Sequence, residues 1–168
     1  MTATDALNHE FQHETATTRR HLERLTENRF GWRPHQKSFT AGELASHLVD
    51  CVGWAASILH QEEVDIDPAT WRPFIATSSA QLLSTFDEKV AAGTRALSDT
   101  TEQHLAELWR LKVKGKTRFE RPRSMVFRDF TLSHMIHHRG QFSVYLRLLE
   151  IPVPGSYGPT ADEQIQRT

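Results

Sequence analysis

The chain has one cysteine, no long apolar run and no excess of either charge. A single cysteine, Cys51, excludes an intramolecular disulfide and any cysteine-rich zinc site, so histidine would have to carry a metal. The 20 basic and 21 acidic residues nearly cancel, which argues against a nucleic-acid partner or an anionic membrane surface. No apolar stretch approaches the roughly 20 residues that cross a bilayer.

The N-terminal stretch and the length of the chain are those of a single folded domain. The N-terminal stretch MTATDALNHEFQHE is polar and acidic, unlike a signal peptide, and we therefore expect a soluble, cytoplasmic protein. The length of 168 residues suffices for one hydrophobic core and is short for two, so we expect residues 1–168 to form a single domain.

Apolar residues recur at three- and four-residue spacing, which is typical of amphipathic helices. A capping box at Thr40 and Glu43 marks one helix start, and Pro152 and Pro154 prevent the last helix from continuing. The pattern predicts helices over about 4–28, 41–60, 79–97 and 124–150. With no credible sheet, we expect an all-α four-helix bundle.

Two segments lie between the expected helices. Residues 61–77 contain Asp67-Pro68 and Arg72-Pro73 and are predicted to be a connector. Residues 98–122 are the least legible part: TTEQHLAELW is compatible with a short helix and KVKGKTRF with a turn flanked by extended chain. We therefore expect a short irregular insertion before the last long helix.

The ten histidines differ in the helix face on which they fall. Counting about 100° per residue from Phe130, His134 lies near 40° and His138 near 80°, on the face expected to point inward. The adjacent His137 lies near −20°, at the margin of that face. The same count places Leu148 inward and turns Arg139 away.

The other histidines provide a candidate partner and a control. His47 lies beside the buried stripe of the second expected helix. His9 and His13 have the same four-residue spacing as the pair on the last helix, but they point away from the stripe of the first helix. Histidine spacing is therefore informative only on a buried face.

Each inward residue also has a structural explanation. A lone buried histidine such as His47 usually packs, with its nitrogens bonded to backbone or water. Two at i and i+4 need partners for four ring nitrogens, and one divalent ion satisfies an acceptor on each ring. Gln141 and Tyr145, on the same face, are candidate catalytic groups or packing residues. Cys51, one turn after His47, either approaches a metal or packs as a small apolar side chain.

Two stretches, KSFTAGELASHL and HMIHHRGQFSVYLRLLEIPVPGSYGPTADE, together resemble the DinB superfamily of bacterial proteins. The combination of HRGQ, YLR and YGP is far more specific than the histidine spacing alone. The resemblance implies an up-down-down-up four-helix bundle, often dimeric. It also implies that His47, His134 and His138 hold a divalent metal, with His137 as a substitute ligand after a small helix rotation.

The resemblance implies chemistry as well. Three imidazoles suit zinc or nickel, with iron as the alternative, and leave coordination positions open. Characterised DinB-like proteins include metal-dependent transferases and isomerases that use mycothiol, bacillithiol or glutathione. We therefore expect a metal-dependent enzyme, either a thiol-dependent S-transferase or isomerase acting on a small electrophile or a hydrolase-like one. The alternatives are a non-catalytic metal-binding stress-response module and a dimerisation unit without an ion, and the wide apolar arc of the last helix favours a homodimer.

Overall fold

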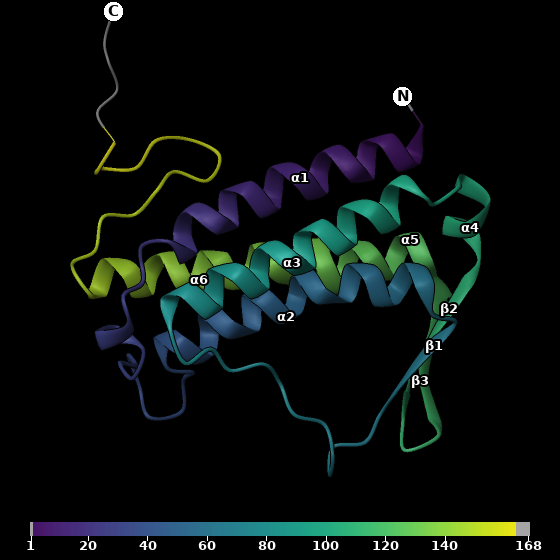
Figure 1. Ribbon diagram of the computed structural model, residues 1–168, viewed down its shortest axis with the longest axis horizontal. Coiled ribbons are helices and arrows are strands. Elements are labelled where there is room, and N and C mark those ends of the chain that lie inside the picture. Colours follow the sequence, from purple (N-terminus) through teal and green to yellow (C-terminus); the bar gives the residue numbers. More distant parts are fainter. Residues whose placement is uncertain (1, 164–168) are drawn as a thin grey trace, which may run out of the picture.

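The computed structural model describes residues 2–163 and is mostly helical, with a small sheet at one end (Figure 1). The long helical elements are α1 (Ala3–Leu22), α2 (Ala41–His60), α3 (Ser79–Ser98), and the unbroken stretch α5 (Arg123–Val126), η2 (Phe127–Ser133) and α6 (His134–Leu148). Helix α2 packs against α3 and against the last helical stretch, and α1 packs against α3 and α6. Within residues 2–163, no helix is both long and apolar enough to cross a membrane.

The apolar stripes predicted for the first two helices form the core. On α2 the predicted capping box is present: the Thr40 hydroxyl accepts from the Glu43 N–H at 3.1 Å, and the Glu43 carboxylate accepts from the Thr40 N–H at 2.7 Å. Helix α1 ends at Leu22, earlier than predicted, and the chain turns into a short 3₁₀ helix, η1 (Glu27–Arg29). The predicted inward residues are all buried: Leu7, Phe11, Thr15, Thr18, Leu22 and Leu25 from the first segment, and Leu44, Leu48, Cys51, Ala55 and Ile58 from the second.

The all-α prediction is wrong, because the chain also forms a three-stranded sheet. Strand β1 (Glu63–Ile66) comes from the expected connector and pairs in parallel with β2 (Leu108–Val113). Strand β2 pairs antiparallel with β3 (Lys116–Pro122) through a two-residue turn. Lys114 and Gly115 in that turn both have positive φ, the geometry that tight hairpins favour. The irregular insertion is thus α4 (Glu102–Ala106) followed by a hairpin.

The sheet is anchored to the end of α2. Trp109 of β2 is fully buried, and its ring meets Trp54 of α2 edge-on at 6.3 Å. The buried guanidinium of Arg123 donates to the carbonyls of Ile58 and Gln61. Because the last carbonyls of a helix lack intrahelical donors, this arginine satisfies the C-terminus of α2.

The last helical stretch buries a different face from the one predicted. Arg139, expected to point outward, is 2 % exposed, whereas Leu148, expected inward, is 55 % exposed. The cause is the choice of Phe130 as the reference residue: its ring is only partly buried and packs against Trp54 and Phe119 beside the sheet, so a count of about 100° per residue from it points to the wrong face. The buried face of α6 is Met135, Arg139, Phe142 and Leu146, and the histidine face lies at its border.

The described part of the C-terminal coil packs back on α1 and α6. The Arg147 guanidinium binds the Asp162 carboxylate at 2.6 Å, which in turn accepts from the Val153 N–H at 2.8 Å. The Tyr157 hydroxyl donates to the Glu14 carboxylate at 3.0 Å. These contacts hold the tail at the end of the helices opposite the sheet (Figure 1).

Candidate metal centre

The imidazole rings of His47 on α2 and of His134 and His138 on α6 lie beside one another. The ring centroids are 4.9 Å apart for His47 and His134, 4.6 Å for His47 and His138, and 4.7 Å for His134 and His138. All three side chains are partly buried. The structure therefore brings together the three histidines that the sequence singled out, although they come from two segments far apart in the chain.

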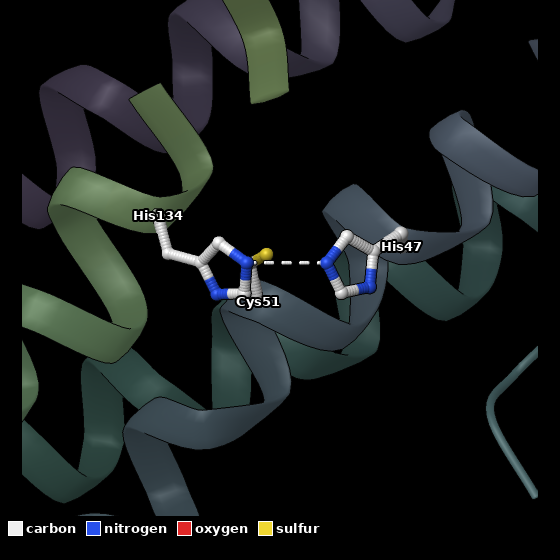
Figure 2. Close-up of side chains that lie close together, drawn as sticks. All are labelled: His47, Cys51 and His134. Carbon is white, nitrogen blue, oxygen red and sulfur yellow. Dashed lines mark hydrogen bonds between the residues drawn. The ribbon is translucent and has the colours of Figure 1, made fainter. Parts of the chain in front are cut away.

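The spacing of the nearest nitrogens fits a shared ion. The Nε2 atoms of His47 and His134 face each other at 3.2 Å (Figure 2). Two ligands of a tetrahedral zinc, each at roughly 2.0–2.1 Å, lie about 3.3 Å apart. The two rings thus already have the separation that neighbouring zinc ligands adopt.

Cys51 belongs to the same cluster. Donor atoms of His47, Cys51 and His134 all lie within 4.8 Å of one another, and the sulfur lies beside the paired rings in Figure 2. Cys51 is fully buried, and this burial, with a smaller effect of the Asp50 charge, raises the pKa of its thiol to about 12. Without a metal the thiol is neutral and packs as an apolar group, but a bound cation would deprotonate it.

The orientation of His138 is fixed by Gln141, one turn further along α6. The Nδ1 of His138 donates to the Gln141 side-chain oxygen at 2.7 Å. Since Nδ1 carries the proton, Nε2 holds the free lone pair of this ring. Gln141 is therefore placed to orient His138 as a ligand. Residues that hydrogen-bond to the ligands of a metal commonly have this role.

Segment η2 is π-helical, which changes the backbone hydrogen bonds at His134. The His134 backbone N–H bonds to the carbonyls of Asp129 and Thr131, whereas in a regular α-helix it would bond to Phe130. The Nε2 atom of the His134 ring faces His47 and is the atom that would reach a shared ion.

All three rings are neutral at pH 7. Burial lowers the pKa of His47 and of His138. Burial, followed by repulsion from His138 and His47, lowers the pKa of His134 to about 4. Imidazole binds metal ions only in its neutral form, so these shifts favour ligation.

Two cavities flank the cluster. One of about 420 Å³ is lined by His138, Gln141, Tyr145 and Val144 of α6 and by Lys37 and Phe39 of the loop before α2. A smaller one of about 170 Å³ lies beside His47. The Tyr145 hydroxyl donates to the Phe39 carbonyl at 3.2 Å, so this tyrosine ties the loop to α6. A small molecule therefore has access to the histidines from the solvent side.

The remaining histidines of the sequence prediction lie outside the cluster. His137 is exposed, with its ring 4.9 Å from that of His138. His9 and His13 are exposed on α1, as the face count predicts.

Comparisons with known proteins agree with this architecture. The chain is 26 % identical over 153 residues to the uncharacterized protein YrdA of Bacillus subtilis (strain 168), covering 91 % of this chain and 87 % of that one. The crystal structure of a DinB-like protein from Bacillus cereus ATCC 10987 matches with a TM-score of 0.71 at 24 % identity, covering 91 % of this chain and 97 % of the other.

A second crystal structure, of the DinB-like protein YjoA from Bacillus subtilis, matches with a TM-score of 0.67 at 17 % identity and covers 91 % of this chain and 99 % of that chain. At these identities the two structures support the fold alone. The sequence model of the DinB family matches residues 1–168. This match spans the whole chain, and the protein therefore belongs to the DinB family.

Proposed function

We propose that the protein holds one divalent metal ion through the Nε2 atoms of His47, His134 and His138, and that it catalyses a thiol-dependent S-transfer or isomerisation of a small electrophile. The main support for the metal site is the 3.2 Å distance between the Nε2 atoms of His47 and His134. The cavity beside His138 supports the catalytic part, because an enzyme needs an open side at its metal.

Zinc and nickel suit three neutral imidazoles best, with iron as the alternative. When bound, such an ion acts as a Lewis acid that lowers the pKa of a water or thiol at its open position toward neutrality. The low pKa of His134 keeps its nitrogen unprotonated for this purpose.

The residues around the cavity have separate tasks in this proposal. Gln141 holds the His138 ring in the ligand tautomer, and Tyr145 fixes the position of the Phe39 loop, so both are positioning residues. Phe39 and Val144 present apolar side chains to the cavity and would exclude water from a bound electrophile. Lys37, on the same wall, supplies a cation for an anionic group of the thiol.

Metal analysis of protein purified without a histidine tag tests the site, and a screen of electrophiles with mycothiol, bacillithiol and glutathione tests the reaction. We expect about one equivalent of metal, as for a mononuclear site. His47→Ala and His138→Ala should lose both the metal and the turnover. His9→Ala, a histidine removed from the exposed side of α1, should keep both. Metal binding without turnover on any of the three thiols would contradict the transferase.

The cluster with Cys51 favours a second candidate, a non-catalytic metal-binding module of the stress-response kind. If the thiolate joined the three histidines, the ion would have four protein ligands and no open position, which is typical of structural zinc. Chelation would then remove several kcal/mol of folding stability. If the ion is catalytic, its removal by chelation should change the midpoint of thermal unfolding much less.

Two further features of the family belong to the proposal. We propose that α1, α2, α3 and the stretch Arg123–Leu148 run in the up-down-down-up order of a DinB four-helix bundle. We also propose a homodimer, because Val144 and Leu148 leave apolar surface exposed on α6. Gel filtration of the purified protein tests the dimer, and elution at the mass of one chain, 19.3 kDa, would contradict it.

A further inference from the structure

A cavity of about 330 Å³ lies beside α2, away from the three histidines, and the metal site does not use it. Trp54 of α2, Val64 of β1 and Trp71 of the segment between β1 and α3 contribute to its walls. The volume lies within the range of roughly 300–1,000 Å³ that small-molecule sites occupy. Its size and its separate wall segments indicate a binding pocket.

Two indole rings define the shape of this pocket. The rings of Trp54 and Trp71 are inclined by only 21°, with centroids 6.4 Å apart. Trp54 is held rigid by Trp109 at 6.3 Å and by Phe130 at 5.8 Å, both edge-on. Trp71 is fixed by its backbone N–H, which donates to the Asp67 carbonyl at 2.7 Å. Near-parallel aromatic walls favour a flat, unsaturated ligand over a bulky aliphatic one.

Trp71 is 46 % exposed, although tryptophan is among the side chains that gain most from burial. A flat molecule seated against it would cover this surface without any change in the core.

The charges that line the pocket neutralise each other. Lys89 of α3 binds the Asp50 carboxylate at 2.9 Å, and the same carboxylate accepts from the Phe74 N–H at 3.1 Å. Gly53 leaves room for the Lys89 side chain, because a Cβ there would lie 3.1–3.2 Å from its outer atoms. With both charges paired, a charged ligand would find no counter-ion, and a neutral one is favoured.

The polar atoms at the other end are uncharged. Ser57 and Gln61, one turn apart on the wall of the pocket, offer a hydroxyl and a terminal amide. They can bind one polar substituent of a ligand whose ring lies against the indoles. Asp50 also lines the cavity beside His47, so the two sites are neighbours separated by the Asp50–Lys89 ion pair.

We propose that the pocket lined by Trp54 and Trp71 binds a neutral, planar aromatic molecule that carries one hydrogen-bonding substituent. The pocket needs no metal, so this inference stands independently of the proposed function. It assigns the protein a second ligand site next to the histidine cluster.

The test is a titration of the full-length, ¹⁵N-labelled protein with 2-naphthol in the presence of EDTA, followed by the indole N–H signals. We expect the signals of Trp54 and Trp71 to shift and saturate. Trp32, which packs against Tyr145 at 5.5 Å, serves as the internal control and should not move. Saturable shifts of Trp32 without those of Trp54 and Trp71 would place the binding elsewhere and overturn the proposal.

Variants distinguish binding in the pocket from nonspecific binding of 2-naphthol elsewhere on the protein. Trp71→Ala should weaken 2-naphthol binding about tenfold, the cost of one lost aromatic contact. Trp32→Ala should leave the affinity unchanged. Gln61→Ala, an exposed position, should weaken 2-naphthol and leave naphthalene unaffected. Unchanged affinity in Trp71→Ala, or equally tight binding of the naphthalene-2-sulfonate anion, would overturn the proposal.

Discussion

Arg139 and Glu14 form an ion pair of 2.7 Å in which the two side chains are only 2 % and 6 % exposed. The same guanidinium donates to the Glu14 carbonyl at 3.1 Å and to the Tyr157 hydroxyl at 2.8 Å. Arg139 thus joins α6, α1 and the C-terminal coil. Since His138 is the preceding residue, about 100° around the helix, this inward anchor turns His138 toward α2.

Breaking this ion pair should destabilise the fold. Arg139→Met leaves the Glu14 carboxylate buried without its partner and should lower the free energy of unfolding by about 3–5 kcal/mol. The double variant Glu14→Leu with Arg139→Met removes both charges and should recover much of the loss. Urea unfolding of the wild type, both single variants and the double variant measures the coupling. Additive single effects would contradict a direct pair.

Gln141 should act on metal affinity through His138. Gln141→Leu removes the acceptor for the His138 Nδ1 proton and should weaken zinc binding by roughly 10–100-fold, as loss of such hydrogen-bond partners does. Gln141→Glu keeps an acceptor at the same reach and is the matched control. Competition with a coloured zinc chelator measures both. Equal affinities in the two variants would show that this hydrogen bond does not orient the ligand.

The metal-free protein should lose stability as the pH falls below about 6.5, the usual pKa of histidine. His21 is fully buried, and burial lowers its pKa in the folded state. As the pH falls, His21 is therefore protonated in the unfolded chain before it is protonated in the folded protein. The free energy of unfolding is highest above about pH 6.5 and decreases as the pH falls toward the lowered pKa of the folded state. His47, His134 and His138 act in the same direction.

The measurement is the free energy of unfolding in urea at several pH values between 7.5 and 5, with EDTA present. His21→Asn keeps a donor for the Thr17 carbonyl, which the His21 Nδ1 contacts at 2.9 Å, and should reduce the pH dependence. His9→Asn, on the exposed side of α1, should leave it as in the wild type. A steeper pH dependence in His21→Asn would contradict a lowered pKa of His21 in the folded state.

The parts of the fold that follow from local rules could be predicted from the sequence. The capping box at Thr40 and the apolar stripes of α1 and α2 depend on spacing alone. The β2–β3 hairpin was only one possible interpretation of residues 98–122, because its turn, Lys114-Gly115, lacks the usual asparagine or aspartate. The pairing of β1 could not be predicted, because its partner strand lies more than 40 residues later.

The proximity of the three histidines was predicted better than the buried face of the helix that carries two of them. His134 and His138 lie four residues apart on α6, so they share one face whichever residue the count starts from. The orientation relative to the core depends on the starting residue, and Phe130 is not on the buried stripe, so Arg139 and Leu148 were assigned to the wrong sides. The place of Cys51 beside the histidines follows from its position one turn after His47, but its role depends on the distance to α6.

In the proposed site three histidines hold the metal while Cys51 does not, which leaves one side of the ion open. X-ray absorption of the zinc-loaded, untagged protein counts the ligands directly. We expect three imidazole nitrogens and a further light atom at roughly 2.0–2.1 Å, with a spectrum unchanged in Cys51→Val. A sulfur shell at about 2.3 Å that disappears in Cys51→Val, or fewer than three imidazoles, would contradict it.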